Sequence, residues 1–142
     1  MDICYQESET AAVAQSLLSH IAPSTEQATI VALGGDLGAG KTTLTKEIAR
    51  ILGVSVEVTS PTFVLARWYD TTDDRWVRLV HIDAYRIESL VELEQMKWDM
   101  VCAQPQTLVI VEWPERIHDA LPASTVSFHI EHHGDERRIT TL

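Results

Sequence analysis

One eight-residue segment restricts the fold more than any other feature of the chain. Residues 35–42 read Gly-Asp-Leu-Gly-Ala-Gly-Lys-Thr and match the pattern G-x-x-x-x-G-K-[ST] at every position. An apolar, β-branched run at residues 28–33 precedes the segment, and apolar side chains recur at helical spacing over residues 41–52. This order of strand, loop and helix is the context in which the pattern forms a phosphate-binding loop, so a chance glycine turn is a poor explanation.

Each part of this loop has a physical role in binding the phosphates of a nucleoside triphosphate. The glycines permit positive φ angles, and the dipole of the following helix adds positive potential. Backbone amides of the loop are expected to turn inward as an anion nest. We expect Lys41 to reach the β- and γ-phosphates and the Thr42 hydroxyl to bind Mg²⁺. The predicted nucleotide-binding residues of the loop are Gly38, Ala39, Gly40, Lys41, Thr42 and Thr43.

Two apolar strands end in a carboxylate. Residues 108–112 read Leu-Val-Ile-Val-Glu, and residues 79–83 read Leu-Val-His-Ile-Asp. Ligands of open α/β sheets bind at the carboxyl ends of the strands, and a P-loop site needs an acid there to hold Mg²⁺ or its water. We predict that Glu112 binds Mg²⁺ with Thr42 and that Asp83 orients the attacking water, so that both join Lys41 in the catalytic set. The alternative for each acid is a structural, strand-capping role.

The remaining pattern predicts the fold class. Helices are expected at residues 8–21, 41–52 and 89–102, and strands at 28–33, 63–69, 76–83, 107–111, 125–131 and 137–142. Buried strands that alternate with helices predict a three-layer α/β/α fold with a mixed, mostly parallel sheet. A length of 142 residues suits one domain, so we expect residues 1–142 to form a single P-loop domain.

The composition indicates which binding partners and which cellular compartment to expect. The chain has 21 acidic and 11 basic residues and a net charge of -10, which disfavours direct, tight binding to bare RNA or DNA. We expect a cytoplasmic protein with no membrane association, because we find neither a signal-peptide pattern nor an apolar run of about 18 residues. The two cysteines are too few for a disulfide framework. GTPases usually recognise the guanine base with an Asn-Lys-x-Asp motif. The sequence contains no asparagine and therefore lacks this motif, which favours ATP over GTP.

Several residues admit two interpretations. The segment at 60–63, Ser-Pro-Thr-Phe, either senses the γ-phosphate through a group such as Thr62 or is only a turn induced by Pro61. His81 is either a functional residue or a hydrogen-bonded core histidine. Trp113 follows Glu112 and is either a site residue or a core residue that packs beside Pro114.

Four segments together resemble the bacterial TsaE family of small ATPases. They read Gly-Asp-Leu-Gly-Ala-Gly-Lys-Thr-Thr at 35–43, Ser-Pro-Thr-Phe at 60–63, His-Ile-Asp-Ala-Tyr-Arg at 81–86 and Val-Glu-Trp-Pro-Glu at 111–115. The resemblance implies a P-loop fold that binds ATP and Mg²⁺ and hydrolyses ATP slowly, in a manner that depends on the partners TsaB and TsaD. It also implies nucleotide contacts from Thr10 and from Arg137.

In that family, the three proteins serve the threonylcarbamoyl modification of adenosine beside the anticodon of tRNA. The resemblance therefore implies that this chain acts on tRNA only indirectly, through the protein complex, which suits its acidic composition. The main alternative is a small-molecule P-loop kinase, which would share the phosphate chemistry. Such kinases usually carry an arginine-rich lid, whereas the arginines here are scattered along the chain.

Overall fold

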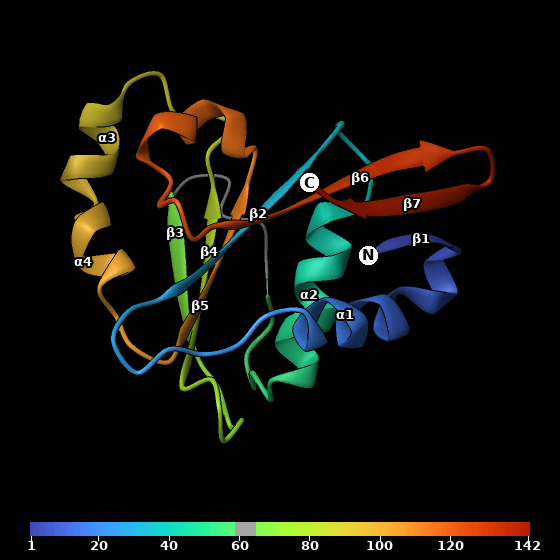
Figure 1. The fold of residues 1–142 in the computed structure, drawn as a ribbon, viewed down its shortest axis with the longest axis horizontal. Coiled ribbons are helices and arrows are strands. Elements are labelled where there is room, and N and C mark those ends of the chain that lie inside the picture. The colour runs from blue at the N-terminus through green and yellow to red at the C-terminus, as the bar shows by residue number, and fades with distance from the viewer. Residues whose placement is uncertain (59–64) are drawn as a thin grey trace.

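The computed structural model describes residues 1–58 and 65–142, and its strands form one seven-stranded sheet (Figure 1). The strand order across the sheet is β1-β7-β6-β2-β5-β4-β3. The strands are β1 (Asp2–Tyr5), β2 (Thr29–Gly35), β3 (Ala66–Asp70), β4 (Arg78–Asp83), β5 (Thr107–Glu112), β6 (Val126–His133) and β7 (Glu136–Thr141).

The centre of the sheet is parallel and its two edges are antiparallel. β6, β2, β5 and β4 pair in parallel, whereas β3 pairs antiparallel with β4, and β7 pairs antiparallel with both β6 and β1. The predicted α/β class with a mixed sheet is confirmed, and the parallel part of the prediction holds for these four central strands. The carboxyl ends of these four strands lie side by side at one end of the sheet. Open α/β sheets bind ligands at this end.

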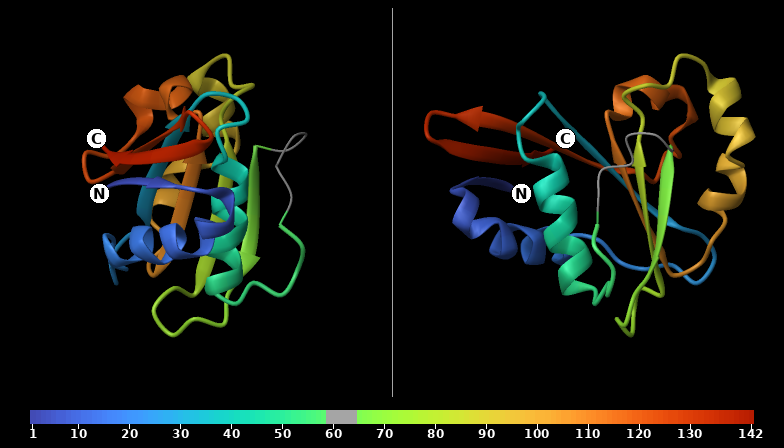
Figure 2. Two further views of the ribbon diagram at one scale, coloured as in Figure 1. Left: turned by 90° about the vertical axis from the view of Figure 1, so that its right-hand side faces the viewer. Right: turned by 180° about the vertical axis from the view of Figure 1, so that it is seen from behind.

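Helices cover the sheet on two sides (Figure 2). The helices α1 (Thr10–Ser19) and α2 (Lys41–Ile51) pack on one face, and the short 3-10 helix η1 (Glu7–Glu9) leads into α1. The helices α3 (Leu90–Gln95) and α4 (Trp98–Cys102) pack on the other face together with the 3-10 helix η2 (Pro114–Ala120). None of the helices within residues 1–58 and 65–142 has the length and apolar character needed to cross a membrane.

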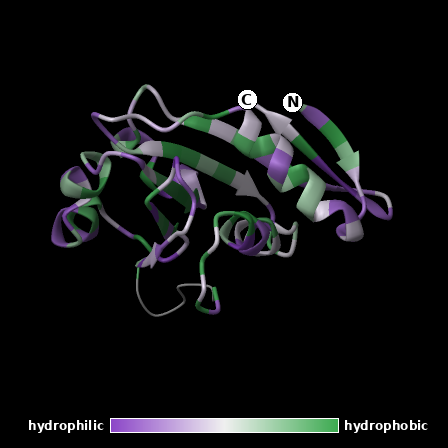
Figure 3. Ribbon diagram, turned by 90° about the horizontal axis from the view of Figure 1, so that it is seen from below, coloured by the Kyte–Doolittle hydropathy of each residue, from purple (hydrophilic) through white to green (hydrophobic). Residues whose placement is uncertain are grey.

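Side-chain alternation divides the core into two layers. On β5, Leu108 and Ile110 pack with α1 and α2, while Val109 and Val111 pack with α3 and α4. All six residues of β5 are buried, as expected of a strand covered on both faces, and the central strands are accordingly apolar (Figure 3). The result is a rigid central platform that fixes the position of Glu112, the last residue of β5.

The predicted helix at 89–102 is wrong, because the segment forms two short helices. Ser89 and Glu92 form a capping box at the start of α3, and Lys97 adopts a left-handed conformation with φ 60° between α3 and α4. In one continuous helix, Leu93 and Trp98 would point about 140° apart around the axis. The break lets both side chains enter the same core layer, where they are 2% and 6% exposed.

The first strand, β1, has no counterpart in the sequence prediction. It has four residues, of which only Tyr5 is buried. Pairing with β7 at the far end of the chain holds it in place, and Arg138 reinforces the pairing with two hydrogen bonds of 2.9 and 2.7 Å to the Asp2 carboxylate. This partner lies 136 residues away, so no local pattern indicates the strand.

Candidate functional site

The loop between β2 and α2 is held in a conformation that requires glycine at two positions. Gly35 has φ 139°, and a Cβ there would lie 2.2 Å from the Ile130 carbonyl oxygen. Gly40 has φ 108° and serves as the N-cap of α2, whose first turn closes through a 3.0 Å bond from the Leu44 amide to the Gly40 carbonyl. The N-terminus of α2 therefore faces the cavity that the loop encloses, as in an anion-binding site.

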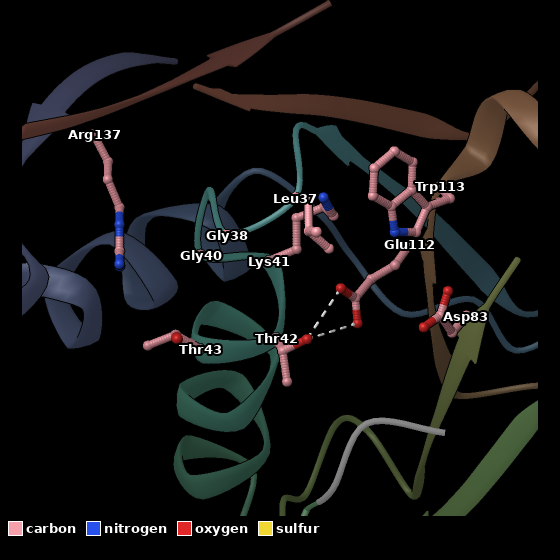
Figure 4. Close-up of a pocket in the computed structure, with 10 residues that line it drawn as sticks. All are labelled: Leu37, Gly38, Gly40, Lys41, Thr42, Thr43, Asp83, Glu112, Trp113 and Arg137. Atoms are coloured by element: carbon pink, nitrogen blue, oxygen red, sulfur yellow. Dashed lines mark hydrogen bonds between the residues drawn. The ribbon is translucent and has the colours of Figure 1, made fainter. Parts of the chain in front are cut away.

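This cavity, of about 220 Å³, gathers residues from across the sheet (Figure 4). Its lining combines loop residues with residues from the ends of β4 and β5 and from β7. The lining residues are Leu37, Gly38, Gly40, Lys41, Thr42, Thr43, Asp83, Glu112, Trp113 and Arg137. Most of the residues predicted from the sequence to form the site are thus brought together around one space.

Lys41 is buried and folds back onto its own loop. Its Nζ atom donates hydrogen bonds of 2.5 Å to the Gly35 carbonyl and 2.9 Å to the Asp36 carbonyl, and lies 4.1 Å from the ring centroid of Trp113. Burial lowers the pKa of the Lys41 ammonium, against the opposing effect of nearby carboxylates, of which Glu112 is the largest contributor. A lysine so placed is a cation held at low hydration beside the anion nest.

Glu112 accepts hydrogen bonds from two side chains. The Thr42 hydroxyl lies 3.2 and 3.3 Å from its two carboxylate oxygens, and Nε2 of His81 bonds to its Oε2 atom. Glu112 is 3% exposed and His81 is completely buried. The structure therefore brings Thr42 and Glu112 together, and their shared binding of Mg²⁺ stays a prediction.

Asp83 lies beside Glu112 at the end of the neighbouring strand. The two residues are partners in the β4–β5 register, and both line the cavity. The Oδ1 atom of Asp83 also accepts a 3.0 Å hydrogen bond from the Tyr85 amide. The turn-capping role is therefore present in the structure, and it uses only Oδ1; within residues 1–58 and 65–142, no hydrogen bond engages the second carboxylate oxygen of Asp83.

Arg137 reaches the loop from β7, on the opposite side from Glu112 (Figure 4). Its side chain is 17% exposed and lies 3.8 Å from the Glu7 carboxylate. Its Nη1 atom is buried and has no hydrogen-bond partner within the described part of the chain. A buried guanidinium nitrogen beside an anion nest is suited to an oxyanion ligand.

Three of the residues predicted from the sequence are not among the cavity-lining residues. Thr10 is buried at the start of α1, where its hydroxyl donates a 2.7 Å bond to the Glu7 carbonyl. Ala39 is fully buried, and its amide donates to the Asp36 carbonyl within the loop. Thr62 and the rest of the segment at 60–63 lie outside the described residues.

Two lining residues were not predicted as site residues. Leu37 is 82% exposed at the tip of the loop, and Trp113 has a left-handed backbone with φ 57° directly after Glu112. Strained backbone at a non-glycine residue is concentrated at functional sites, but it leaves no trace in the sequence. The ring of Trp113 contacts both Lys41 and Tyr85 and lines one wall of the cavity, and it also packs against the core layer formed with α3 and α4.

The donor set suits Mg²⁺ only together with a nucleotide. The Thr42 hydroxyl and the Glu112 carboxylate supply the hard oxygen atoms that Mg²⁺ prefers. No group of three or more His, Cys, Asp or Glu side chains that could hold a metal occurs among the described residues. Mg²⁺ would therefore need phosphate oxygens and water molecules to complete its coordination, as is usual for this ion.

The parallel sheet, the glycine loop with its lysine, and the carboxylate on the adjacent strand define the class of P-loop α/β domains. The sequence model of the family described as "Threonylcarbamoyl adenosine biosynthesis protein TsaE" matches residues 4–140. Since this match covers nearly all of the chain, the chain belongs to the TsaE family.

Individual relatives agree with this assignment. A Bacillus subtilis (strain 168) protein named tRNA threonylcarbamoyladenosine biosynthesis protein TsaE is 36% identical over 134 residues, which are 94% of this chain and 78% of the relative. A Streptomyces coelicolor protein of the same name is 46% identical over 87 residues, which are 61% of this chain and 57% of the relative. A crystal structure of YdiB from Bacillus subtilis superposes with a TM-score of 0.70 at 30% identity, covering 99% of this chain and 84% of that one.

Proposed function

We propose that this chain binds ATP with Mg²⁺ and hydrolyses it in the biosynthesis of threonylcarbamoyladenosine in tRNA, in complex with TsaB and TsaD. The observation that carries the proposal is the convergence of Lys41, Thr42 and Glu112 on the cavity at the N-terminus of α2. The names of the relatives supply the pathway. TsaB and TsaD enter through the family resemblance of the sequence segments.

Each of the proposed site residues has a separate role in phosphoryl transfer. Lys41 would exchange its bonds to the Gly35 and Asp36 carbonyls for bonds to the phosphates. Thr42 and Glu112 would hold Mg²⁺, whose positive charge stabilises the charge that develops on the phosphate oxygens. Asp83 would orient water at the open side of the cavity. In such reactions, positioning and electrostatic stabilisation contribute more than base strength.

The acidic composition supports a role within a protein complex rather than direct binding to RNA. A net charge of -10 opposes direct contact with a tRNA backbone, so tRNA would be held by the partners. The hydrolysis rate of the isolated chain is expected to be low and to rise when the partners complete the site. Product formation by the complex would then depend on ATP turnover by this chain.

Phosphate release with purified TsaB and TsaD tests the proposal. The expected result is slow release by the chain alone, a clear increase with both partners, and no increase with Lys41→Ala, which loses a charge-assisted contact of at least ~1.5–3 kcal/mol. Transfer of the γ-phosphate to a small acceptor would identify a kinase instead. ATP binding without turnover in the full complex would show a nucleotide-gated binding module.

A further inference from the structure

His81 occupies an unusual place for a polar residue. It lies in the middle of β4, between Val80 and Ile82, and its side chain is completely buried. The neighbouring positions of the strand are filled by apolar residues of the two core layers. Burying an imidazole costs free energy unless its nitrogens are hydrogen-bonded, so the contacts of His81 decide why it is there.

The only hydrogen bond of the His81 ring within the described residues joins Nε2 to Oε2 of Glu112. His81 pairs in register with Ile110 of β5, and Glu112 lies two residues further along the same face of that strand. Because a carboxylate only accepts hydrogen bonds, Nε2 carries the proton and donates it. His81 thus reaches Glu112 from the interior of the sheet.

Thr42 reaches the same carboxylate from α2. Its hydroxyl lies 3.2 Å from Oε1 and 3.3 Å from Oε2, while His81 contacts Oε2 alone. The bond from His81 therefore fixes which oxygen points into the protein. Within the described residues, Oε1 has only the Thr42 hydroxyl as a hydrogen-bond donor, and Glu112 lines the cavity where the phosphates and Mg²⁺ of the proposed function would lie.

We infer that His81 is a positioning residue for Mg²⁺ binding, which acts by locking the rotamer of Glu112. The inference rests on the proposed function, because it assigns a role toward the same metal. Partners of metal-binding carboxylates orient these ligands, and their loss typically lowers metal affinity or activity by about 10- to 100-fold. A histidine that served only the core would have no effect on the metal.

The test compares three substitutions of His81 by the Mg²⁺ dependence of ADP affinity, measured by calorimetry on the full chain. His81→Gln can keep a donor near the position of Nε2. His81→Asn is polar but too short to reach Glu112, and His81→Phe fills the space without a donor. Melting temperature and ADP affinity without Mg²⁺ serve as controls for the fold and for the loop.

The expected result is a loss of Mg²⁺ enhancement of about 10- to 100-fold in His81→Phe and His81→Asn, with substantial retention in His81→Gln. ADP affinity without Mg²⁺ should match the wild type in all three. If His81→Phe fails to fold, the comparison of His81→Asn with His81→Gln still decides. Equal Mg²⁺ enhancement in these two variants and the wild type would overturn the inference and leave the proposed function standing. If Mg²⁺ does not increase the ADP affinity of the wild type, the Mg²⁺ binding assigned in the proposed function is wrong, and the role of His81 is wrong with it.

Discussion

The guanidinium of Arg137 packs against Gly40, so that a Cβ at Gly40 would stand 2.9 Å from Nη1 and 3.0 Å from Cζ. The last strand of the chain thereby touches the loop at the residue that caps α2. A side chain at this position would require the guanidinium of Arg137 to shift.

The first prediction follows from this contact. Gly40→Ala should lower the free energy of unfolding by more than the ~1–2 kcal/mol expected for a non-glycine residue in left-handed backbone, because Arg137 must also move. Gly38→Ala is the matched control, since Gly38 has φ 77° but no atom of the described residues lies within 4 Å of the place that its Cβ would take. Urea unfolding of the unliganded proteins measures both. Equal losses in the two variants would contradict the proposed clash.

The second prediction concerns the pH dependence of stability at Lys41. Burial lowers the pKa of Lys41 from its ordinary value of 10.5, so the folded chain binds its proton less tightly than the unfolded chain. The cost of burying the charge is therefore complete at neutral pH and is relieved as pH rises through the folded pKa toward 10.5.

Lys41→Met removes this charge and gives the comparison. Its stability relative to the wild type should be more favourable at about pH 7 than at about pH 10, because only the wild type gains from deprotonation. The measurement is urea unfolding of both proteins at the two pH values. Burial also raises the pKa of Tyr5, but this contribution is common to both proteins and cancels. A difference that does not change with pH would contradict the prediction.

The third prediction separates the two roles of Asp83. Asp83→Asn retains an oxygen that can accept the Tyr85 amide, so the turn should stay capped while the negative charge is lost. We expect a nearly unchanged melting temperature, nearly unchanged ATP binding and loss of partner-stimulated hydrolysis. Asp83→Ala loses the cap as well and should cost about 0.5–1.5 kcal/mol of stability. Normal turnover per folded molecule of Asp83→Asn would show that the residue is structural.

The fourth prediction concerns the two free thiols. Burial, with a smaller contribution from Asp99, raises the pKa of Cys102 to about 11, whereas Cys4 is exposed. The thiolate is the reactive form, so at about pH 8 Cys102 should react at least ~100-fold more slowly than an ordinary thiol. Disulfide-exchange labelling of Cys4→Ser and Cys102→Ala measures each thiol separately. Rapid labelling of folded Cys4→Ser would contradict the assignment.

The sequence predicted the phosphate loop because its constraints are local. The glycines, Lys41 and Thr42 are adjacent in the chain, and the strand before them and the helix after them have clear periodicity. Glu112 and Asp83 could be predicted from the sequence for a similar reason. Each ends an apolar run, and neighbouring parallel strands align their carboxyl ends.

The missed features depend on contacts between distant segments. β1 forms through β7, and the break at Lys97 reflects how Leu93 and Trp98 share one core layer. The contact of His81 with Glu112 joins residues 31 positions apart on neighbouring strands. Nothing in the local sequence distinguishes such a histidine from one that serves only the core.

The position of Arg137 has a mechanical consequence. The cavity takes residues from β7, from the loop after β2 and from the ends of β5 and β4, so a nucleotide bound to the loop and to Arg137 would connect the antiparallel edge with the parallel centre of the sheet. Such a ligand would add a link between β7 and the loop after β2, and local opening of β7 would then become less favourable. Amide hydrogen exchange should then slow in β7 and in β1 when a nucleotide binds. Because β1 contributes no residue to the cavity lining, slower exchange there would show that nucleotide binding at the loop stabilises the outer edge of the sheet.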